Sequence, residues 1–377
     1  GRLGNMKYLI LPFIFFLFTA CDIENVPNIT DTDSFGQYIE SEMEEMHIPA
    51  LSLMIFKENQ ILYEGYFGES NIENQVKLEE DHLFLLASVS KVITATAMLQ
   101  LYDEGFLGLD DPINDHLPFE VKIPGQTKPI TFRMLLTHTS GIADGDALDT
   151  QYYYGKDSPI ALGDFLKDYL IEGRQYYNES QNFYDFEPGT QHEYSNIGNA
   201  LIGHLVEQIS GLNFNTYCKE NIFIPLGMTH SYWRLDEIQE TIVTPYNYER
   251  KSYKPVQHYT FTDYPNGGLR STSQDLFKFL RAFVQEGQSN GHSLLKASTI
   301  AQVLTPQIPT IDAEVGLHMF LMNKNQNLWG HDGGEEGVAT IMAFNSDTKI
   351  GAIVLSNQGD VDLEEIIEQA YLLGTSL

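Results

Sequence analysis

Cysteines and basic residues are both scarce in this sequence. Only two cysteines, Cys21 and Cys218, occur among its 377 residues, so it offers neither a disulfide framework nor a zinc site built from cysteines. Lysine and arginine together number 22 against 52 aspartates and glutamates, a formal net charge of −30. Such a chain lacks the basic surface that binds phosphate backbones, so we expect no nucleic-acid partner. Its 11 histidines form no HExxH or similar cluster, so we expect no metal and no cofactor.

Long apolar runs are also scarce. The most prominent one, residues 8–18, is shorter than the roughly 20 residues that a typical membrane-spanning helix needs. It follows Met6 and Lys7, and small residues precede the cysteine at its end, a pattern typical of a secretory signal. We therefore interpret residues 1–20 as leader and signal peptide, with Met6 as the initiator.

The end of this signal resembles a bacterial lipobox. Residues 18–21 read Phe-Thr-Ala-Cys, which predicts cleavage before Cys21 and lipid attachment to its sulfur. The protein would then be a membrane-anchored lipoprotein of the bacterial cell envelope, periplasmic or on the surface. The alternative is a plain signal peptide cleaved near Ala20. If Cys21 carries lipid, Cys218 has no partner, and we predict that it is a buried apolar residue on a helix.

The rest of the chain reads as a tether over residues 21–33 and one domain over 34–377. Hydrophobic residues make up 42% of the sequence, enough for a large core. Apolar spacing predicts strands near both ends and helices between them. The expected strands are 50–56, 60–68, 316–322, 338–344 and 350–355. The expected helices are 34–46, 88–104, 160–171, 197–209, 274–285 and 361–373.

This order of elements predicts an α+β fold. The N- and C-terminal strands would form one antiparallel sheet flanked by helices, and a mostly helical lobe, about residues 131–290, would be inserted between them.

Three short motifs could carry chemistry, and the first is Ser-Val-Ser-Lys at residues 88–91. Ser88 and Lys91 are spaced i, i+3, so they share one helix face. A serine hydroxyl needs a nearby base to become a nucleophile, and a buried lysine with a lowered pKa can be that base. Taken alone, however, Ser88 could simply be a helix N-cap.

The second motif is Tyr-Ser-Asn at residues 194–196, between a turn and a helix. Tyr194 could move a proton between Ser88 and a leaving group, and Asn196 could bind a substrate amide. An ordinary turn with a packed tyrosine is the alternative.

The third motif is His-Asp-Gly-Gly at residues 331–334, just before an expected strand. Its glycines would let a substrate backbone approach closely, and the amides of Gly334 and Ser88 could form an oxyanion hole. His331 could donate a hydrogen bond, or bind a carboxylate when protonated.

In this order the three motifs resemble those of the serine β-lactamase and penicillin-binding-protein superfamily, most closely its class C β-lactamase-like branch of DD-peptidases, D-aminopeptidases and esterases. Further segments are similar to the family: 131–141, 194–200, 224–228, 266–272 and 275–276. The resemblance covers roughly residues 35–370. It implies an antiparallel sheet flanked by helices, a helical lobe, and an active site between them.

The resemblance also implies roles for the motif residues. Ser88 would be acylated, Lys91 would accept its proton, and Tyr194 would act as general base and acid. Asn196, His331, Gly333 and Gly334 would contact substrate, His331 from an edge strand. His138, in the segment 131–141, would lie in a structural loop.

Two departures from the family pattern stand out. His-Asp-Gly replaces the usual Lys-Thr-Gly, and a histidine near its ordinary pKa of about 6.5 is mostly neutral at pH 7, so its grip on a β-lactam carboxylate would be weaker. The stretch 151–184 is rich in tyrosine, which could form a rim around the active site or pack within the lobe.

The sequence therefore predicts a serine hydrolase that forms an acyl-enzyme on Ser88 with small-molecule or peptide substrates. Esters and D-amino-acid peptides are favoured as substrates over β-lactams. The alternative is a catalytically idle penicillin-binding or sensor lipoprotein on the same fold. The natural substrate and the oligomeric state stay open.

Overall fold

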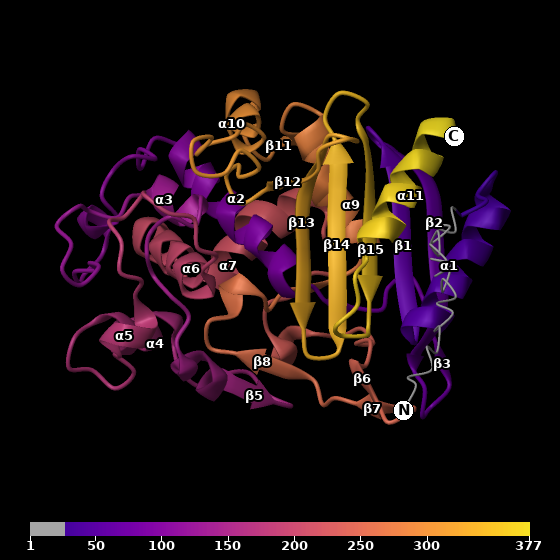
Figure 1. Ribbon diagram of the computed structural model, residues 1–377, viewed down its shortest axis with the longest axis horizontal. Coiled ribbons are helices and arrows are strands. Elements are labelled where there is room, and N and C mark those ends of the chain that lie inside the picture. Colours follow the sequence, from indigo (N-terminus) through magenta and orange to yellow (C-terminus); the bar gives the residue numbers. More distant parts are fainter. Residues whose placement is uncertain (1–26) are drawn as a thin grey trace, which may run out of the picture.

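A seven-stranded antiparallel sheet joins the two ends of the chain described by the computed structural model, residues 27–377 (Figure 1). Its strand order is β12-β13-β14-β15-β1-β2-β3. The central pair, β1 and β15, aligns Leu51 with Ser356. The predicted sheet of N- and C-terminal strands is therefore confirmed. The strands are β1 (Ala50–Lys57), β2 (Gln60–Asn71), β3 (Val76–Lys77), β12 (Phe320–Asn323), β13 (Leu328–Glu335), β14 (Val338–Asn345) and β15 (Ile350–Ser356).

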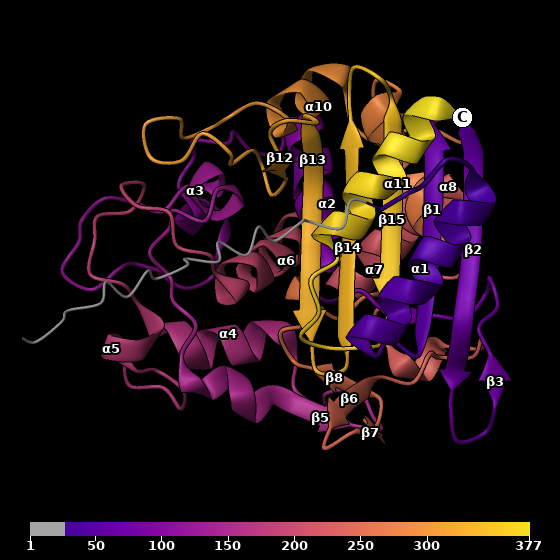
Figure 2. The same cartoon turned by 45° about the vertical axis from the view of Figure 1, so that its right-hand side comes forward.

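Two helices cover one face of this sheet, α1 (Thr32–Met46) and α11 (Glu364–Ser376) (Figure 2). α1 buries Phe35, Ile39 and Met43, a stripe with helical spacing, against apolar side chains of the sheet. Residues 1–26 lie outside the described residues, and with them the expected signal peptide and Cys21. Within residues 27–377, no helix has both the length and the apolar character needed to cross a bilayer.

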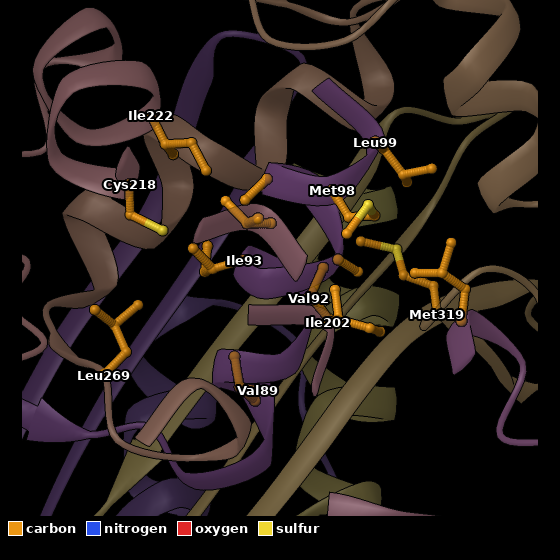
Figure 3. Packing of buried hydrophobic residues seen from close by; sticks show 14 of the residues in the cluster. Val89, Val92, Ile93, Met98, Leu99, Ile202, Cys218, Ile222, Leu269 and Met319 are labelled. Carbon is orange, nitrogen blue, oxygen red and sulfur yellow. The ribbon is translucent and has the colours of Figure 1, made fainter. Parts of the chain in front are cut away.

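Helix α2 (Ser90–Asp103) lies in the core on the opposite side of the sheet. Every residue from Ser90 to Leu101 is buried, so this helix has no solvent-facing side along most of its length. Figure 3 shows apolar side chains of this helix, Val92, Ile93, Met98 and Leu99, in one cluster with Ile202 and Met319 from neighbouring elements. α9 (Ser273–Leu280) also packs on this side, against β1 and β15. A charged residue in the stretch from Ser90 to Leu101 is therefore held away from water.

Most of the remaining helices lie in the left part of the molecule in Figure 1, with α6 packed against α2. Cys218 is fully buried at the end of α7, as predicted. These helices are α3 (Phe132–Leu136), α4 (Leu162–Leu170), α5 (Glu179–Asn182), α6 (Asn196–Ser210), α7 (Phe214–Cys218), α8 (Ile224–Leu226) and α10 (Ala297–Val303). Short strand pairs connect them: β4 (Phe84–Leu85) with β9 (Arg270–Ser271), β5 (Tyr152–Tyr154) with β8 (Tyr259–Phe261), β6 (Tyr246–Glu249) with β7 (Ser252–Pro255), and β10 (Gln288–Ser289) with β11 (His292–Ser293).

One strand that matters for the site was not among those expected from apolar spacing. The third motif does precede a strand, β14, as expected, but residues 331–334 also lie inside β13. Glycine is depleted in strands, so Gly330, Gly333 and Gly334 obscure the strand pattern of β13 in the sequence. Gly330 is needed there because a Cβ would come 1.9 Å from the carbonyl oxygen of Met342 on β14. The expected strand 316–322 is also shorter, because β12 begins only at Phe320.

Candidate active site

Ser88 lies in a single 3-10 turn, Ala87–Val89, directly before α2. Ala87 has a φ of 51°, a left-handed conformation that costs a residue with a Cβ about 1–2 kcal/mol. The surrounding structure holds the turn in place. The backbone N–H of Leu86 donates to the Leu269 carbonyl at 2.8 Å, and the Thr340 hydroxyl donates to the Leu86 carbonyl at 2.6 Å.

The helix N-cap explanation for Ser88 is wrong. Neither the 3-10 turn nor α2 has a side-chain cap. The Ser88 Oγ instead accepts a hydrogen bond from the Lys91 Nζ at 2.8 Å. The serine itself is only half-buried, so its oxygen is held by a protein donor and is still accessible.

Lys91 is fully buried in the first turn of α2. Its Nζ donates to the Ser88 Oγ and to the Asn266 carbonyl, each at 2.8 Å. Burial lowers the pKa of Lys91 to about 7, and the nearby carboxylate of Asp144 opposes that shift. A large fraction of Lys91 is therefore neutral at pH 7, and a neutral amine this close to Ser88 can take its proton.

The ring of Tyr194 lies over Lys91, with the Nζ 4.8 Å from the ring centroid. Although 36% of Tyr194 is exposed, desolvation raises its pKa above the ordinary 10, and interaction with the Ser88 hydroxyl only partly offsets this rise. Tyr194 is consequently protonated at neutral pH. In the resting site Lys91 is the better proton acceptor, and Tyr194 is placed to donate a proton.

Asn196 is the first residue of α6, and Ser195 caps this helix by accepting from the Gly198 N–H at 2.8 Å. Asp144 accepts from the Asn196 backbone N–H at 3.1 Å and from its Nδ2 at 2.9 Å. One N–H of the Asn196 side-chain amide is thus bonded to Asp144. Its Oδ1 can accept from a substrate N–H, and its second N–H can donate to a substrate carbonyl.

His138 packs against the loop that carries Tyr194 and Ser195. Its Nδ1 accepts from the Ser195 backbone N–H at 3.0 Å, and its ring lies 4.5 Å from that of Tyr194 between centroids. On its other side it stacks on His318 at 4.6 Å. Burial lowers the pKa of His138 well below its ordinary value, so it is a neutral residue that positions Tyr194.

His331 is 2% exposed and packs against Tyr194 and Phe320, with ring centroids 6.2 and 5.3 Å away. Burial, and next the charge of Lys91, lower the pKa of His331 to about 3. It is therefore neutral at pH 7 and cannot supply positive charge for a carboxylate. β13 is not the edge strand of the sheet, because β12 pairs with it. This pairing covers only Leu328 to Gly330, so residues 331–335 have a free edge on that side.

The two glycines of the third motif differ in their surroundings. A Cβ on Gly333 would lie 2.7 Å from the Ser88 backbone nitrogen and equally close to the Leu86 carbonyl oxygen. Only glycine lets β13 pack this closely on the turn that carries Ser88. A Cβ on Gly334 would meet no heavy atom within 4 Å. The amides of Ser88 and Gly334 thus belong to two segments in direct contact, beside open space.

The sequence is also similar to known proteins. Residues 35–374 match the family model described as Beta-lactamase. The chain belongs to the Beta-lactamase family. It is 31% identical over 329 residues to a penicillin-binding protein of Bacillus subtilis (strain 168), covering 82% of this chain and 68% of that relative. It is 24% identical over 336 residues to Protein flp of Staphylococcus aureus, covering 88% of this chain but only 64% of the relative.

Solved structures share the fold of this Beta-lactamase family member. One described as a class C β-lactamase superposes with a TM-score of 0.72 at 20% identity, covering 93% of this chain and 98% of the other. The resemblance and the fold expected from the sequence are both confirmed, and the chain is a member of the β-lactamase and penicillin-binding-protein family of serine hydrolases.

Three groups at this family member's site were not expected from the sequence. They are the Asn266 carbonyl that binds Lys91, the Asp144 carboxylate that holds Asn196, and Glu335 at the end of β13. Asn266 stands in a segment already similar to the family, which was a usable signal. Asp144 and Glu335 gave none, because only the fold brings them to the site.

The site opens to solvent, since Tyr194 and Gly334 are exposed. A hollow of about 480 Å³ lies elsewhere, near Trp233 and Tyr264, and none of the motif residues lines it. The tyrosines of the stretch 151–184 serve both expected roles, packing within the lobe and lying near the site. Tyr169 is buried within the helical part, whereas Tyr152 bonds to Glu335 close to the site.

Proposed function

We propose that this protein is an active acyl-transfer hydrolase that forms an acyl-enzyme on Ser88 with ester or amide substrates. The observation that carries the proposal is the 2.8 Å contact between the buried Lys91 Nζ and the Ser88 Oγ. A neutral Lys91 accepts the serine proton as Oγ attacks the substrate carbonyl carbon. The backbone N–H groups of Ser88 and Gly334 would stabilise the negative oxygen that forms.

The bond to the leaving alcohol or amine then breaks, and that group takes a proton from Tyr194 or protonated Lys91. Water attacks the acyl-enzyme next, gives up a proton to the same residues, and releases the carboxylic acid with free Ser88. Asn196 would orient the substrate through its Oδ1, and no step requires a metal or cofactor.

Esters and D-amino-acid peptides are the substrates we favour, and β-lactams are a weaker candidate. His331 supports this order, because its pKa of about 3 leaves the third motif without the positive charge that would hold a β-lactam carboxylate.

Labelling tests the proposal directly. The purified protein is treated with a neutral fluorophosphonate or a fluorescent penicillin, and its intact mass is measured. We expect one adduct on the wild type and none on Ser88→Ala. No adduct on the wild type would favour an idle binding protein on the same fold, and an adduct that survives Ser88→Ala would place the reactive residue elsewhere.

We also propose that the protein is a lipoprotein of the bacterial cell envelope, anchored through Cys21, with its substrate on the same side of the membrane. Residues 18–21 support this proposal, and Cys21 lies outside the described residues. Expression in a bacterial host, followed by detergent partition and mass spectrometry of the N-terminal peptide, tests it. We expect a diacylglyceryl mass on Cys21 and release of Cys21→Ser into the aqueous phase.

A further inference from the structure

The surroundings of Ser88 are acidic. Asp144, Glu335, Asp263 and Asp332 are all close enough to act on the charge of Lys91. Within residues 27–377, none of these four carboxylates forms an ion pair with a lysine, arginine or histidine. Apart from Lys91, which is buried, a substrate would therefore meet negative charge that no protein cation neutralises.

Three of these carboxylates are poorly placed to bind a substrate, because they already accept hydrogen bonds from the protein or lie on another side of the strand. Asp144 accepts three hydrogen bonds at the start of α6, from Asn196 and Ile197. Asp263 is 4% exposed and bonds to Asn266, although its Oδ1 has no partner among the described residues. Asp332 borders a small hollow with Asp362, on the side of α11.

Glu335 is placed differently. Alternate residues of a strand face the same side, so Glu335 shares its face of β13 with Gly333. A Cβ on Gly333 would lie 2.7 Å from the Ser88 nitrogen, and two residues of strand add only about 7 Å. The Glu335 side chain therefore starts about two extended residues along β13 from the point where this strand contacts the turn that carries Ser88.

Tyr152 holds this carboxylate in place. Its hydroxyl lies 3.0 Å from both carboxylate oxygens of Glu335, and Tyr152 comes from β5, outside the main sheet. A carboxylate can accept about four hydrogen bonds, so one tyrosine hydroxyl leaves room for another donor. Burial raises the pKa of Glu335, and a bound ammonium group would favour its ionised form.

From this geometry we propose that the substrate carries a free ammonium group close to the scissile carbonyl, as an aminoacyl ester or amide does, and that Glu335 binds this group. The inference rests on the proposed acyl-transfer function and names its substrate class. In the reaction Ser88 takes the aminoacyl group, the alcohol or amine leaves with the proton, and water releases the free amino acid or peptide.

Matched substrates test the proposal with the whole purified protein. Alanine, N-acetylalanine and N-succinylalanine are compared as methyl esters and as p-nitroanilides, in both D and L forms, at pH 7. The free α-amino group is then mostly protonated. We expect kcat/KM for the free-amine compounds to exceed that for their N-acetyl forms by about tenfold, as one charged hydrogen-bonded pair supports, and N-succinyl compounds to be poorest.

Glu335→Gln should reduce the ratio of free-amine to N-acetyl turnover to about one. Glu336→Gln is the matched control, because Glu336 also accepts from a β5 tyrosine, Tyr154 at 3.0 Å, and is adjacent on the chain. It should keep the preference. Fluorophosphonate labelling of Ser88 shows whether the nucleophile is assembled in each variant.

Where a parallel sample of the wild type labels at Ser88, equal turnover of free-amine and N-acetyl substrates by the unlabelled enzyme, or a preference that survives Glu335→Gln, would overturn this inference alone. A wild type that takes no fluorophosphonate would overturn the proposed function, and the substrate inference with it.

Discussion

The Lys91 Nζ donates a hydrogen bond to the Ser88 Oγ at 2.8 Å, and Lys91 itself is fully buried. In this position one residue has two opposed effects. Burial makes Lys91 a base near neutral pH, which the chemistry needs, and the same burial makes its charged form costly to the fold. Activity and stability should therefore respond in opposite directions when Lys91 changes.

Lys91→Met should nearly abolish acylation. Methionine fills a similar volume but accepts no proton, and a positioned acid–base group contributes about 100- to 10,000-fold to a rate. The second-order rate constant for fluorophosphonate labelling measures the loss. Lys278→Met, which removes a lysine bonded to the Gly227 carbonyl, is the control and should react like the wild type. A Lys91→Met rate within threefold of the wild type would contradict the assigned base.

The same variant should be more stable than the wild type at low pH. The pKa of Lys91 is lowered from 10.5 to about 7 in the folded protein. Below pH 7 the residue is charged in both the folded and unfolded states, and the full cost of burying the charge is present. Between pH 7 and 10.5 only the unfolded state binds the proton, so wild-type stability rises with pH.

Lys91→Met lacks this dependence. Its advantage in unfolding free energy, on the order of a few kcal/mol at pH 6, should shrink by pH 10. Urea unfolding of both proteins at pH 6, 8 and 10 measures the difference, and a constant gap across this range would argue against the lowered pKa.

The acylation rate of the wild type should rise with pH and level off above about pH 7, as neutral Lys91 accumulates. The slope below the midpoint should be close to tenfold per pH unit. His331 has a pKa of about 3, so it does not titrate in this range, and His331→Gln should leave the midpoint in place. A rate that still rises at pH 10, with no midpoint near neutral pH, would instead identify Tyr194 as the proton acceptor.

Gly333→Ala should destabilise the protein and slow acylation. The new Cβ would meet the Ser88 nitrogen, the Leu86 carbonyl and the Thr340 hydroxyl, each at 2.7 Å, and forcing them apart costs about 1–3 kcal/mol. Gly334→Ala is the matched control for stability, because no heavy atom lies within 4 Å of its Cβ. Unfolding midpoints in urea compare the two, and equal midpoints would show that β13 can move away from the turn without cost.

His331→Lys should increase the rate of acylation by a fluorescent penicillin. The longer side chain can carry a positive charge toward a carboxylate, which the neutral histidine cannot. The same change should lower turnover of amine-bearing esters, because it adds a charge of the wrong sign. If penicillin acylation is unchanged, the shape of the site and not its charge limits β-lactam binding.

The fold was largely predictable because apolar periodicity marks β1, β2, β14, β15 and the helices around them. β13 was not, since its glycines serve close packing against β14 and the Ser88 turn and carry no strand preference. Ser88, Lys91 and Tyr194 were predictable as motif residues with spacing that suits their chemistry. Asp144 and Glu335 were not, because their roles come from contacts between segments far apart in the chain.

The pairing of Leu51 with Ser356 has a consequence for how the protein folds. β1 emerges early in synthesis, yet its neighbour β15 is made about 300 residues later, and such distant pairings are slow to form. Until then the buried strand β1 has an open hydrogen-bonding edge, which is prone to aggregation. We expect refolding from urea to be slow, and a chaperone that holds exposed strands to raise the yield of protein that labels at Ser88.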